Sequence, residues 1–181
     1  VDLSAFYFDI RKDALYCDSK DSERRKSSIV VLNVILESLI KWFAPILSFT
    51  TEEIFTLINK EKKSIHLEKF IKFPKSFENE KLNKKWVELK KIRDICNISI
   101  EAKRATKDIG SSLEASLTIK LNNELFEITE NVDFSELCIT SSVKIEKDNR
   151  NEIDIKTEKA KGLKCPVCWK INEGGCDRHP A

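Results

Sequence analysis

The chain has 181 residues, of which 41% are hydrophobic and 34% are charged, while glycine and proline contribute only four residues each. This composition excludes collagen-like, mucin-like and flexible-linker sequences, and it favours helices with one buried face and one solvated face. The formal net charge is +2, which is too close to neutral to indicate a nucleic-acid-binding protein by itself. Because the chain contains no methionine and begins with Val1, we expect it to be a fragment of a longer protein.

Two helices are predicted at the start of the chain. The apolar stretch over residues 5–16 is expected to be helical in the context of the helices that follow. Residues 22–43 place apolar side chains at the spacing of a helix, and Pro45 ends this helix because proline cannot continue the hydrogen-bond ladder. Since Val30 and Trp42 widen its apolar stripe, we expect this helix to be buried on several sides, as inside a bundle.

A further helix, a connector and a long helix are predicted next. Thr50 and Glu53 fit a capping box, in which each side chain bonds to a free backbone amide, so we expect a helix to begin at Thr50. Residues 59–80 are rich in lysine and irregular, which is typical of a connector. A long connecting helix follows over about residues 80–108, and Gly110 supplies its stop signal.

The predicted helices of residues 1–110 make an antiparallel bundle, and the hydrophobic period changes after it. Residues 113–121 alternate between apolar and polar side chains, as do two later stretches, which predicts strands. A short helix is expected near residues 122–130. Residues 111–157 therefore form a second module, small, acidic and of α+β type, and the fold class is mainly α.

The strongest local pattern lies in a third module, residues 158–181. Its C-x2-C-x7-C-x2-H spacing is formed by Cys165, Cys168, Cys176 and His179. A two-residue spacer lets both side chains of a tight turn reach one ion, and tetrahedral Zn²⁺ takes four such ligands. One structural zinc would then supply the folding free energy of a segment with few apolar residues. The fourth ligand is predicted to be His179, and a residue beyond Ala181 is the alternative.

Two clusters are candidates for contact with nucleic acid. Around the metal motif, cationic side chains suit phosphates and an indole suits stacking on an unpaired base; these candidates are Lys164, Trp169, Lys170 and Arg178. The second cluster, at the start of the helix predicted over residues 22–43, is Arg24, Arg25 and Lys26. Instead of binding a base, Trp169 could simply cover the metal site. Instead of binding phosphates, the second cluster could be an ordinary solvated face of the helix.

The remaining reactive residues show no catalytic pattern. Cys17, Cys96 and Cys138 stand among apolar neighbours and are expected to be small buried hydrophobes, while His66 is expected to lie in a loop. The sequence contains no phosphate-binding loop, nucleophile elbow or H-E-x-x-H pattern, so we expect the chain to be non-catalytic. Clustered thiols and the lack of a membrane-length apolar run favour a cytoplasmic chain without a membrane span.

Four stretches carry a resemblance to a known family. They are Phe6-Tyr7-Phe8-Asp9-Ile10 with Lys12-Asp13 and Leu15-Tyr16; Trp42 with Ala44-Pro45-Ile46-Leu47-Ser48-Phe49-Thr50 and Glu53; Arg93, Asn97, Glu101, Arg104, Lys107, Ile109-Gly110 and Ser112-Leu113-Glu114-Ala115; and Lys164-Cys165-Pro166-Val167-Cys168-Trp169. Together they resemble the C-terminal region of bacterial-type isoleucyl-tRNA synthetases. The first two are similar to the family's anticodon-binding bundle, the third to the segment after it, and the fourth to its terminal zinc knuckle. The family usually carries a second C-x2-C pair after a longer spacer, where this chain has Cys176 and His179.

The resemblance implies that the intact protein attaches isoleucine to tRNA(Ile) with ATP as a substrate. The HIGH and KMSKS signatures of that chemistry do not occur in the sequence, so no catalytic or ATP-binding residue is assigned. The catalytic and editing domains and the first helices of the bundle would precede this chain, whose implied role is recognition of the anticodon stem-loop. We expect a monomer whose partners are tRNA(Ile) and the other domains of its own chain.

Other interpretations of the same residues stay open. The first two motifs occur in looser form in valyl and leucyl synthetases, so a related class I synthetase is one alternative. A DNA-repair glycosylase is another, because some of those enzymes end in a similar zinc finger that binds duplex DNA. In a third interpretation the chain is a protein-interaction module, in which the zinc is only a scaffold and the acidic α+β module docks elsewhere in the enzyme.

Overall fold

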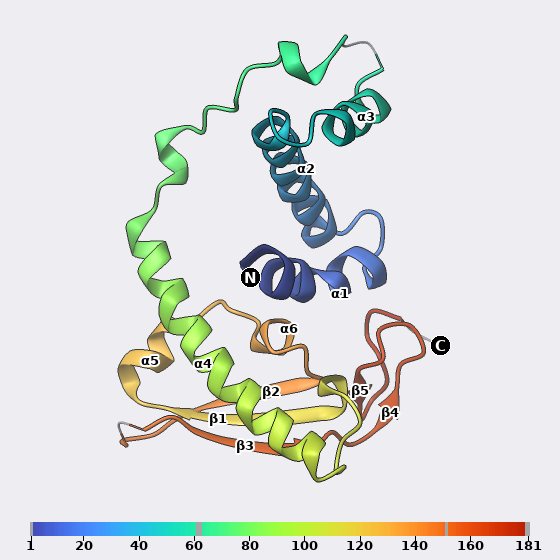
Figure 1. Cartoon of the computed structure of the whole chain (residues 1–181). Helices are drawn as coiled ribbons and strands as arrows, with labels where there is room; N and C mark the ends of the chain where they lie inside the picture. The colour runs from blue at the N-terminus through green and yellow to red at the C-terminus, as the bar shows by residue number, and fades with distance from the viewer. Residues whose placement is uncertain (1, 61–62, 151, 180–181) are drawn as a thin grey trace. The chain divides into compact units, whose positions relative to one another are not determined.

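A computed structural model of the chain describes residues 2–60, 63–150 and 152–179. It divides into two compact units, Asp18–Glu78 and a second unit composed of Val1–Cys17 and Asn79–Ala181 (Figure 1). Of the described residues, 53% are helical and a small sheet is present, which confirms the mainly helical fold class. No helix among these residues is both long and apolar enough to cross a membrane.

The unit Asp18–Glu78 is built from two helices and a partly irregular connector. Helix α2 (Glu23–Phe43) begins where the Ser22 side chain accepts a hydrogen bond from the Arg25 amide, and it ends before Ala44, as Pro45 predicts. Helix α3 (Ser48–Ile58) follows after a short turn. The connector holds 3₁₀ turns at Ile65–Leu67 and Lys75–Phe77. A small core joins these elements through Ile40, Ala44, Phe55 and Ile65.

Two predictions for this unit are wrong. Helix α3 begins at Ser48 rather than at Thr50, and no side chain caps its first turn. Helix α3 starts earlier because the chain folds back directly after α2. Its first turn is closed in part by the Thr51 hydroxyl, which donates to the Leu47 carbonyl at 3.0 Å. The expected burial of α2 on several sides is not found either: Val30 is 61% exposed and Trp42 is 50% exposed. Within the described residues, α2 packs against α3 and the Ile65–Leu67 turn. These two elements bury only the apolar side chains near the C-terminal end of α2.

The second unit combines helices with a three-stranded sheet. A π-helical segment (Asp2–Phe8) leads into α1 (Asp9–Cys17), and α4 (Glu80–Ala105) opens the later part of the unit. A 3₁₀ turn (Ser112–Glu114) precedes β1; the remaining elements are β1 (Ala115–Leu121), α5 (Asn123–Ile128), α6 (Phe134–Leu137), β2 (Ser142–Lys147) and β3 (Asp154–Lys159). The strand order is β2-β1-β3, with β1 parallel to β2 and antiparallel to β3. Helices α5 and α6 make the crossover that a parallel pair of strands needs.

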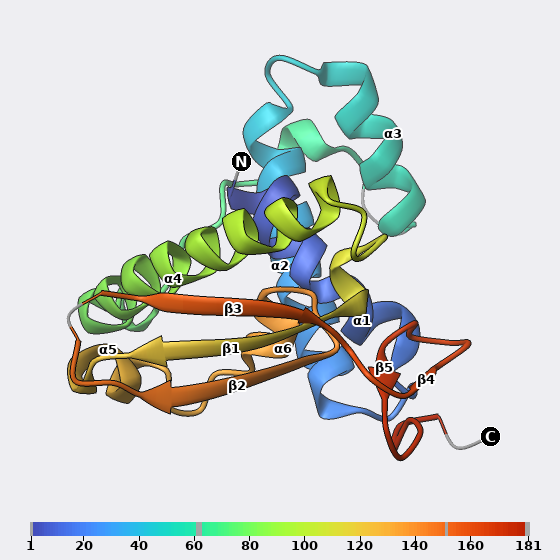
Figure 2. The same ribbon diagram turned by 90° about the horizontal axis from the view of Figure 1, so that it is seen from below.

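Helix α4 packs along the sheet (Figure 2). Its buried residues Leu89, Ile92, Cys96 and Ile100 form one stripe. They share a core with the alternate residues of β1, which are Ala115, Leu117, Ile119 and Leu121. The apolar stripe of α4 matches the buried face of β1, so the long helix packs with the sheet. We call the unit that contains them, Val1–Cys17 with Asn79–Ala181, the α/β unit.

The stop signal of α4 differs from the predicted one. The helix ends at Ala105, and Lys107 takes a left-handed conformation with φ of 61°. Gly110 is not the stop; its amide instead donates to the Glu114 carboxylate at 3.0 Å. The three predicted modules, residues 1–110, 111–157 and 158–181, stay a prediction, and the compact units have different bounds because α1 and α4 pack with the sheet.

The shared core of α4 and β1 generates a stability prediction. Leu89→Ala should lower the free energy of unfolding by about 2–5 kcal/mol, because Leu89 is fully buried and the substitution leaves a cavity. Ile98→Ala on the same helix should change it by less than about 0.5 kcal/mol, since Ile98 is 71% exposed. Urea unfolding followed by circular dichroism measures both, and equal losses for the two variants would contradict this packing.

Candidate metal centre and nucleic-acid interface

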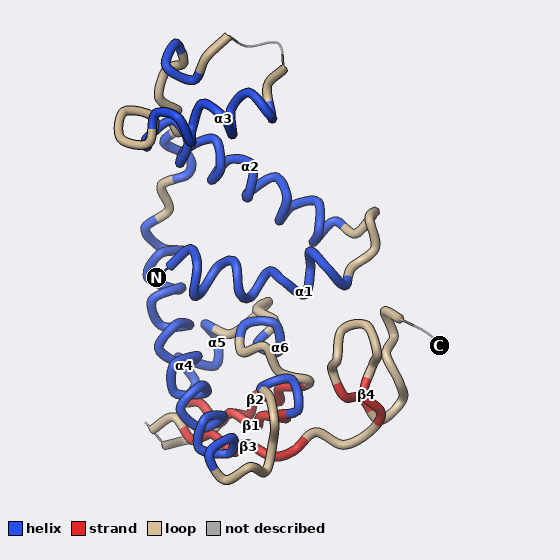
Figure 3. Tube along the Cα trace, turned by 45° about the vertical axis from the view of Figure 1, so that its right-hand side comes forward, coloured by secondary structure: helices blue, strands red, loops and turns tan. Residues whose placement is uncertain are grey.

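A short hairpin begins the cysteine-rich segment that follows β3. Strands β4 (Leu163–Lys164) and β5 (Ile171–Asn172) pair antiparallel, and the rest of residues 163–179 is turn and loop (Figure 3). We call residues 163–179 the knuckle. Between the strands, the Trp169 amide donates to the Cys165 carbonyl at 3.0 Å, which closes a tight turn around the first C-x2-C pair. A second turn holds Cys176 and His179 close together, because the His179 amide donates to the Cys176 carbonyl at 3.1 Å.

The four predicted ligands converge on one point. The three cysteine sulfur atoms and one histidine nitrogen all lie within 4.8 Å of one another. The Sγ atoms of Cys168 and Cys176 are 3.7 Å apart, and His179 Nδ1 lies 3.3 Å from Cys176 Sγ and 3.5 Å from Cys165 Sγ. Metal–sulfur bonds of about 2.3 Å and metal–nitrogen bonds of about 2.0 Å in a tetrahedron place their ligand atoms roughly 3.5–3.8 Å apart. The donor set and its spacing therefore fit a tetrahedral ion.

The local hydrogen bonds favour the thiolate form at two of the three cysteines of this cluster, Cys165 and Cys176. The backbone amide of Cys168 stabilises the negative charge of Cys165 and lowers the pKa of that thiol to about 6, whereas burial raises the pKa of Cys168 to about 11. Burial opposes ionisation of Cys176 too, but the backbone amide of Arg178 and the His179 ring together lower its pKa. Since metal ions bind the thiolate form, Cys165 and Cys176 lose their protons to a metal more readily than Cys168 does.

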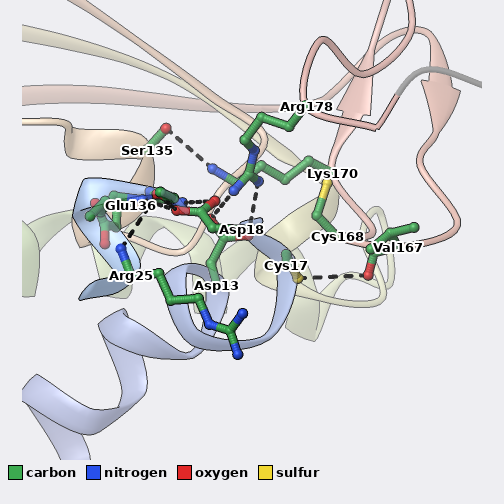
Figure 4. A network of polar contacts seen from close by, with 12 residues as sticks. Asp13, Cys17, Asp18, Arg25, Ser135, Glu136, Val167, Cys168, Lys170 and Arg178 are labelled. Carbon is green, nitrogen blue, oxygen red and sulfur yellow. Dashed lines mark hydrogen bonds and ion pairs between the residues drawn. The ribbon is translucent and has the colours of Figure 1, made fainter. Parts of the chain in front are cut away.

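Helix α1 supplies the contacts around the ligands. His179 Nε2 lies 2.6 Å from the carbonyl oxygen of Cys17, the last residue of α1, and this hydrogen bond raises the pKa of His179. Arg178 forms two hydrogen bonds with the Asp13 carboxylate, at 2.8 and 3.0 Å (Figure 4). The Cys17 thiol lies 3.8 Å from the Val167 carbonyl oxygen (Figure 4). The ligand cluster is thus held against α1 as well as by its own turns.

The nucleic-acid candidates on the knuckle differ in how exposed they are. Trp169 is 59% exposed and takes a left-handed backbone conformation with φ of 63°, which is strained for an aromatic residue. Lys164 is exposed, and its ammonium lies 5.8 Å from the centre of the Trp169 ring. Lys170 approaches the Ser135 hydroxyl at 3.4 Å, and Arg178 is held by Asp13. The indole and the Lys164 ammonium are therefore the groups most open to a ligand.

The second basic cluster lies in the other compact unit, Asp18–Glu78. Arg24 forms two hydrogen bonds of 2.7 Å with the Asp18 carboxylate, and Lys26 pairs with Glu23 at 3.2 Å. The Nε atom of Arg25 is buried without a hydrogen-bond partner among the described residues. Carboxylates thus neutralise two of the three cations of this cluster, which lie in the first turn of α2.

The structure also shows a groove that the sequence analysis missed. It has a volume of about 360 Å³ and lies among α1, α6, the turn before β1 and the knuckle. Its lining includes the apolar or aromatic residues Ile10, Tyr16, Leu113, Ile139, Val167 and Trp169. Tyr16 is 81% exposed although it lies within an apolar helical stretch, and the sequence alone could not pair it with residues more than 100 positions away.

Comparison with known proteins identifies relatives of this chain. Residues 1–119 match the family described as the anticodon-binding domain of tRNA ligase. The isoleucine–tRNA ligase of Pelagibacter ubique (strain HTCC1062) is 78% identical over 179 residues, which cover 99% of this chain and 20% of that protein. The isoleucine–tRNA ligase of Bartonella henselae is 38% identical over 184 residues, covering 96% of this chain and 19% of that protein. The chain thus spans about a fifth of the length of the curated relatives it matches.

The hairpin of the knuckle generates a prediction about glycine. Gly162 has φ of 122°, and a Cβ atom there would lie 2.3 Å from the backbone of Asn172, whereas a Cβ atom at Gly174 would meet nothing within 4 Å. Gly162→Ala should therefore disrupt the pairing of β4 with β5 and destabilise the knuckle by about 1–3 kcal/mol. Gly174→Ala is the matched control and should leave the knuckle intact. Amide hydrogen exchange at Cys165, whose amide donates to the Lys170 carbonyl across the hairpin at 2.9 Å, measures the pairing. Equal protection of this amide in both variants would contradict the prediction.

Proposed function

Because the chain belongs to the family of anticodon-binding domains of tRNA ligases, we propose that it is the tRNA-recognition part of an isoleucine–tRNA ligase. The match over residues 1–119 is the observation that carries this proposal. Under this proposal, the intact enzyme uses ATP to attach isoleucine to tRNA(Ile), and it does so in the cytoplasm. The catalytic and editing domains lie elsewhere in the same chain, the enzyme is a monomer, and no residue of this chain binds ATP.

The proposal includes one structural zinc in the knuckle. The residues that would hold it are Cys165, Cys168, Cys176 and His179, whose donor atoms have the spacing of a tetrahedral site. When bound, the ion cross-links the two turns of the knuckle, and the four protein ligands leave no position for a reacting water. In this view zinc does no chemistry on the tRNA. It fixes the backbone on which the exposed Trp169 and Lys164 stand.

The proposed contacts with tRNA begin at the knuckle. A base that is unstacked from the anticodon loop would stack on the exposed indole of Trp169, and Lys164 and Lys170 would neutralise neighbouring phosphates. The apolar lining of the groove beside Trp169 suits a base or ribose more than a charged group. Arg178 and the cluster Arg24, Arg25 and Lys26 are proposed to contribute less, because carboxylates already hold Arg178, Arg24 and Lys26.

The other interpretations are not favoured. The relatives at 36–78% identity over nearly the whole chain are isoleucine–tRNA ligases, including that of Agrobacterium fabrum (36% identical over 94% of this chain and 19% of that protein). A glycosylase zinc finger would explain only the knuckle, whereas the family match covers the helices of residues 1–119.

Metal analysis tests the proposed zinc site. The chain purified under reducing conditions without chelator should contain about one zinc per chain, and Cys165→Ala should lose it because three donors hold the ion less tightly. Cys96→Ala is the matched control, since Cys96 is buried in the α4–β1 core away from the cluster, and it should keep its zinc. A wild-type chain that contains no zinc under these conditions would remove the proposed site.

Binding of tRNA tests the recognition role. The chain should bind tRNA(Ile) more tightly than an unrelated tRNA, and the affinity should fall as salt rises because phosphate contacts release counterions. Trp169→Ala should weaken binding by about 5- to 150-fold, since stacking of a base on an aromatic ring is worth about 1–3 kcal/mol, and Trp169→Phe should retain most of it. Filter binding or fluorescence anisotropy measures these affinities. Equal affinity for both tRNAs at moderate salt would leave only non-specific electrostatics.

A further inference from the structure

We propose that the C-terminal half of α1 forms the outer shell of the knuckle's metal site, with the Cys17 carbonyl orienting His179 and the Asp13 carboxylate holding Arg178 beside it. This inference rests on the proposed zinc site and goes beyond it. It assigns positioning roles to two residues that lie more than 160 positions from the ligands they serve. Neither residue is itself a metal ligand.

The first step concerns the two nitrogens of the His179 ring. A backbone carbonyl can only accept a hydrogen bond, so the 2.6 Å contact with the Cys17 oxygen places the ring proton on Nε2. The other nitrogen, Nδ1, then carries a lone pair and faces the sulfur atoms of Cys165 and Cys176. An outer acceptor that fixes the tautomer and the ring plane in this way raises the basicity of the metal-binding nitrogen.

The second step explains why this carbonyl is available. Cys17 is the last residue of α1, and the last four carbonyls of a helix have no partner within the helix. A helix C-terminus carries a partial negative charge. This charge favours the Nε2–H group of His179, which becomes more positive when the ring binds a metal ion through Nδ1. The end of α1 therefore places a backbone acceptor with suitable electrostatics at hydrogen-bond distance from the His179 ring.

The third step is the ion pair between Asp13 and Arg178. Asp13 stands one turn before Cys17, so both lie on the same face of α1. The Arg178 side chain is 33% exposed and that of Asp13 is 20% exposed, and the two groups make a bidentate pair at 2.8 and 3.0 Å. Since Arg178 directly precedes His179, the pair holds the end of the knuckle against α1. Without it, the Cys17–His179 bond would have to position the end of the knuckle unaided.

These contacts link metal binding to the docking of the knuckle on α1. A metal ion that binds the oriented His179 ring more tightly than the unoriented ring stabilises the knuckle docked on α1. By the same coupling, the docked knuckle binds the metal more tightly than the undocked one. Weakening the Asp13–Arg178 pair should therefore reduce zinc affinity even though all four ligands remain. Loss of such outer partners weakens metal binding by about 10- to 100-fold in other proteins.

The test compares two isosteric substitutions that each weaken one ion pair of α1. Asp13→Asn weakens the pair with Arg178, whereas the matched control Glu136→Gln weakens the pair between Arg11 and Glu136, which are 2.8 Å apart and do not contact the ligands. Competition with a chromophoric chelator should show zinc affinity at least about tenfold weaker for Asp13→Asn and unchanged for Glu136→Gln. The charge exchange Asp13→Arg with Arg178→Asp should restore most of the affinity.

A second readout separates positioning from general stability. In nitrogen NMR spectra of the zinc-loaded chain, His179 should show a slowly exchanging Nε2 proton in the wild type and in Glu136→Gln, and a faster one in Asp13→Asn. The inference is overturned if the wild type binds zinc and Asp13→Asn binds it equally well, or if both substitutions weaken it equally, or if the charge exchange restores nothing. A wild type that binds no zinc would overturn the proposed metal site itself and this inference with it.

Discussion

The convergence of three sulfur atoms and one imidazole nitrogen is the constraint on which the proposed tRNA-binding surface depends. The knuckle contains two strands of only two residues each, and its buried residues are Cys165 and Cys168, each 5% exposed. Burial of apolar surface cannot hold such a segment in one conformation, because the entropy cost of ordering each residue is about 1–2 kcal/mol. The proposed metal cross-link between the two turns would hold the segment in one conformation, and it would fix the positions of Trp169 and Lys164 on the outside.

The α/β unit provides the base on which this surface stands. Its core joins α4 to β1 through fully buried residues such as Ile92 and Ile119, and Ile10 of α1 packs into the same core. Segments from the two ends of the unit, α1 and the knuckle, therefore meet within one compact unit. This arrangement explains how Asp13 and Cys17 reach Arg178 and His179 across most of the length of the chain.

Features with a local cause were predictable from the sequence. The period of the apolar residues located α2 and α4, the alternation from Leu113 located β1, and Pro45 marked the end of α2. The cysteine spacing identified the four residues whose donor atoms meet. In each case the signal lies within a few residues, because hydrogen-bond geometry or ligand spacing acts at that range.

Features with a tertiary cause were not predictable. The left-handed position after α4 falls on Lys107 rather than on Gly110, because the Lys107 amide closes the helix end by donating to the Arg104 carbonyl at 3.0 Å. The packing of α4 on the sheet depends on the crossover between β1 and β2, which no local pattern encodes. The pair of Asp13 with Arg178 likewise requires the folded unit. The most direct test of the whole account is the affinity of the chain for tRNA(Ile) with zinc bound and after its removal by chelator. We predict binding about 5- to 150-fold weaker without zinc, because the stacking of a base on Trp169 would be lost. Equal affinity in the two states would contradict the central claim.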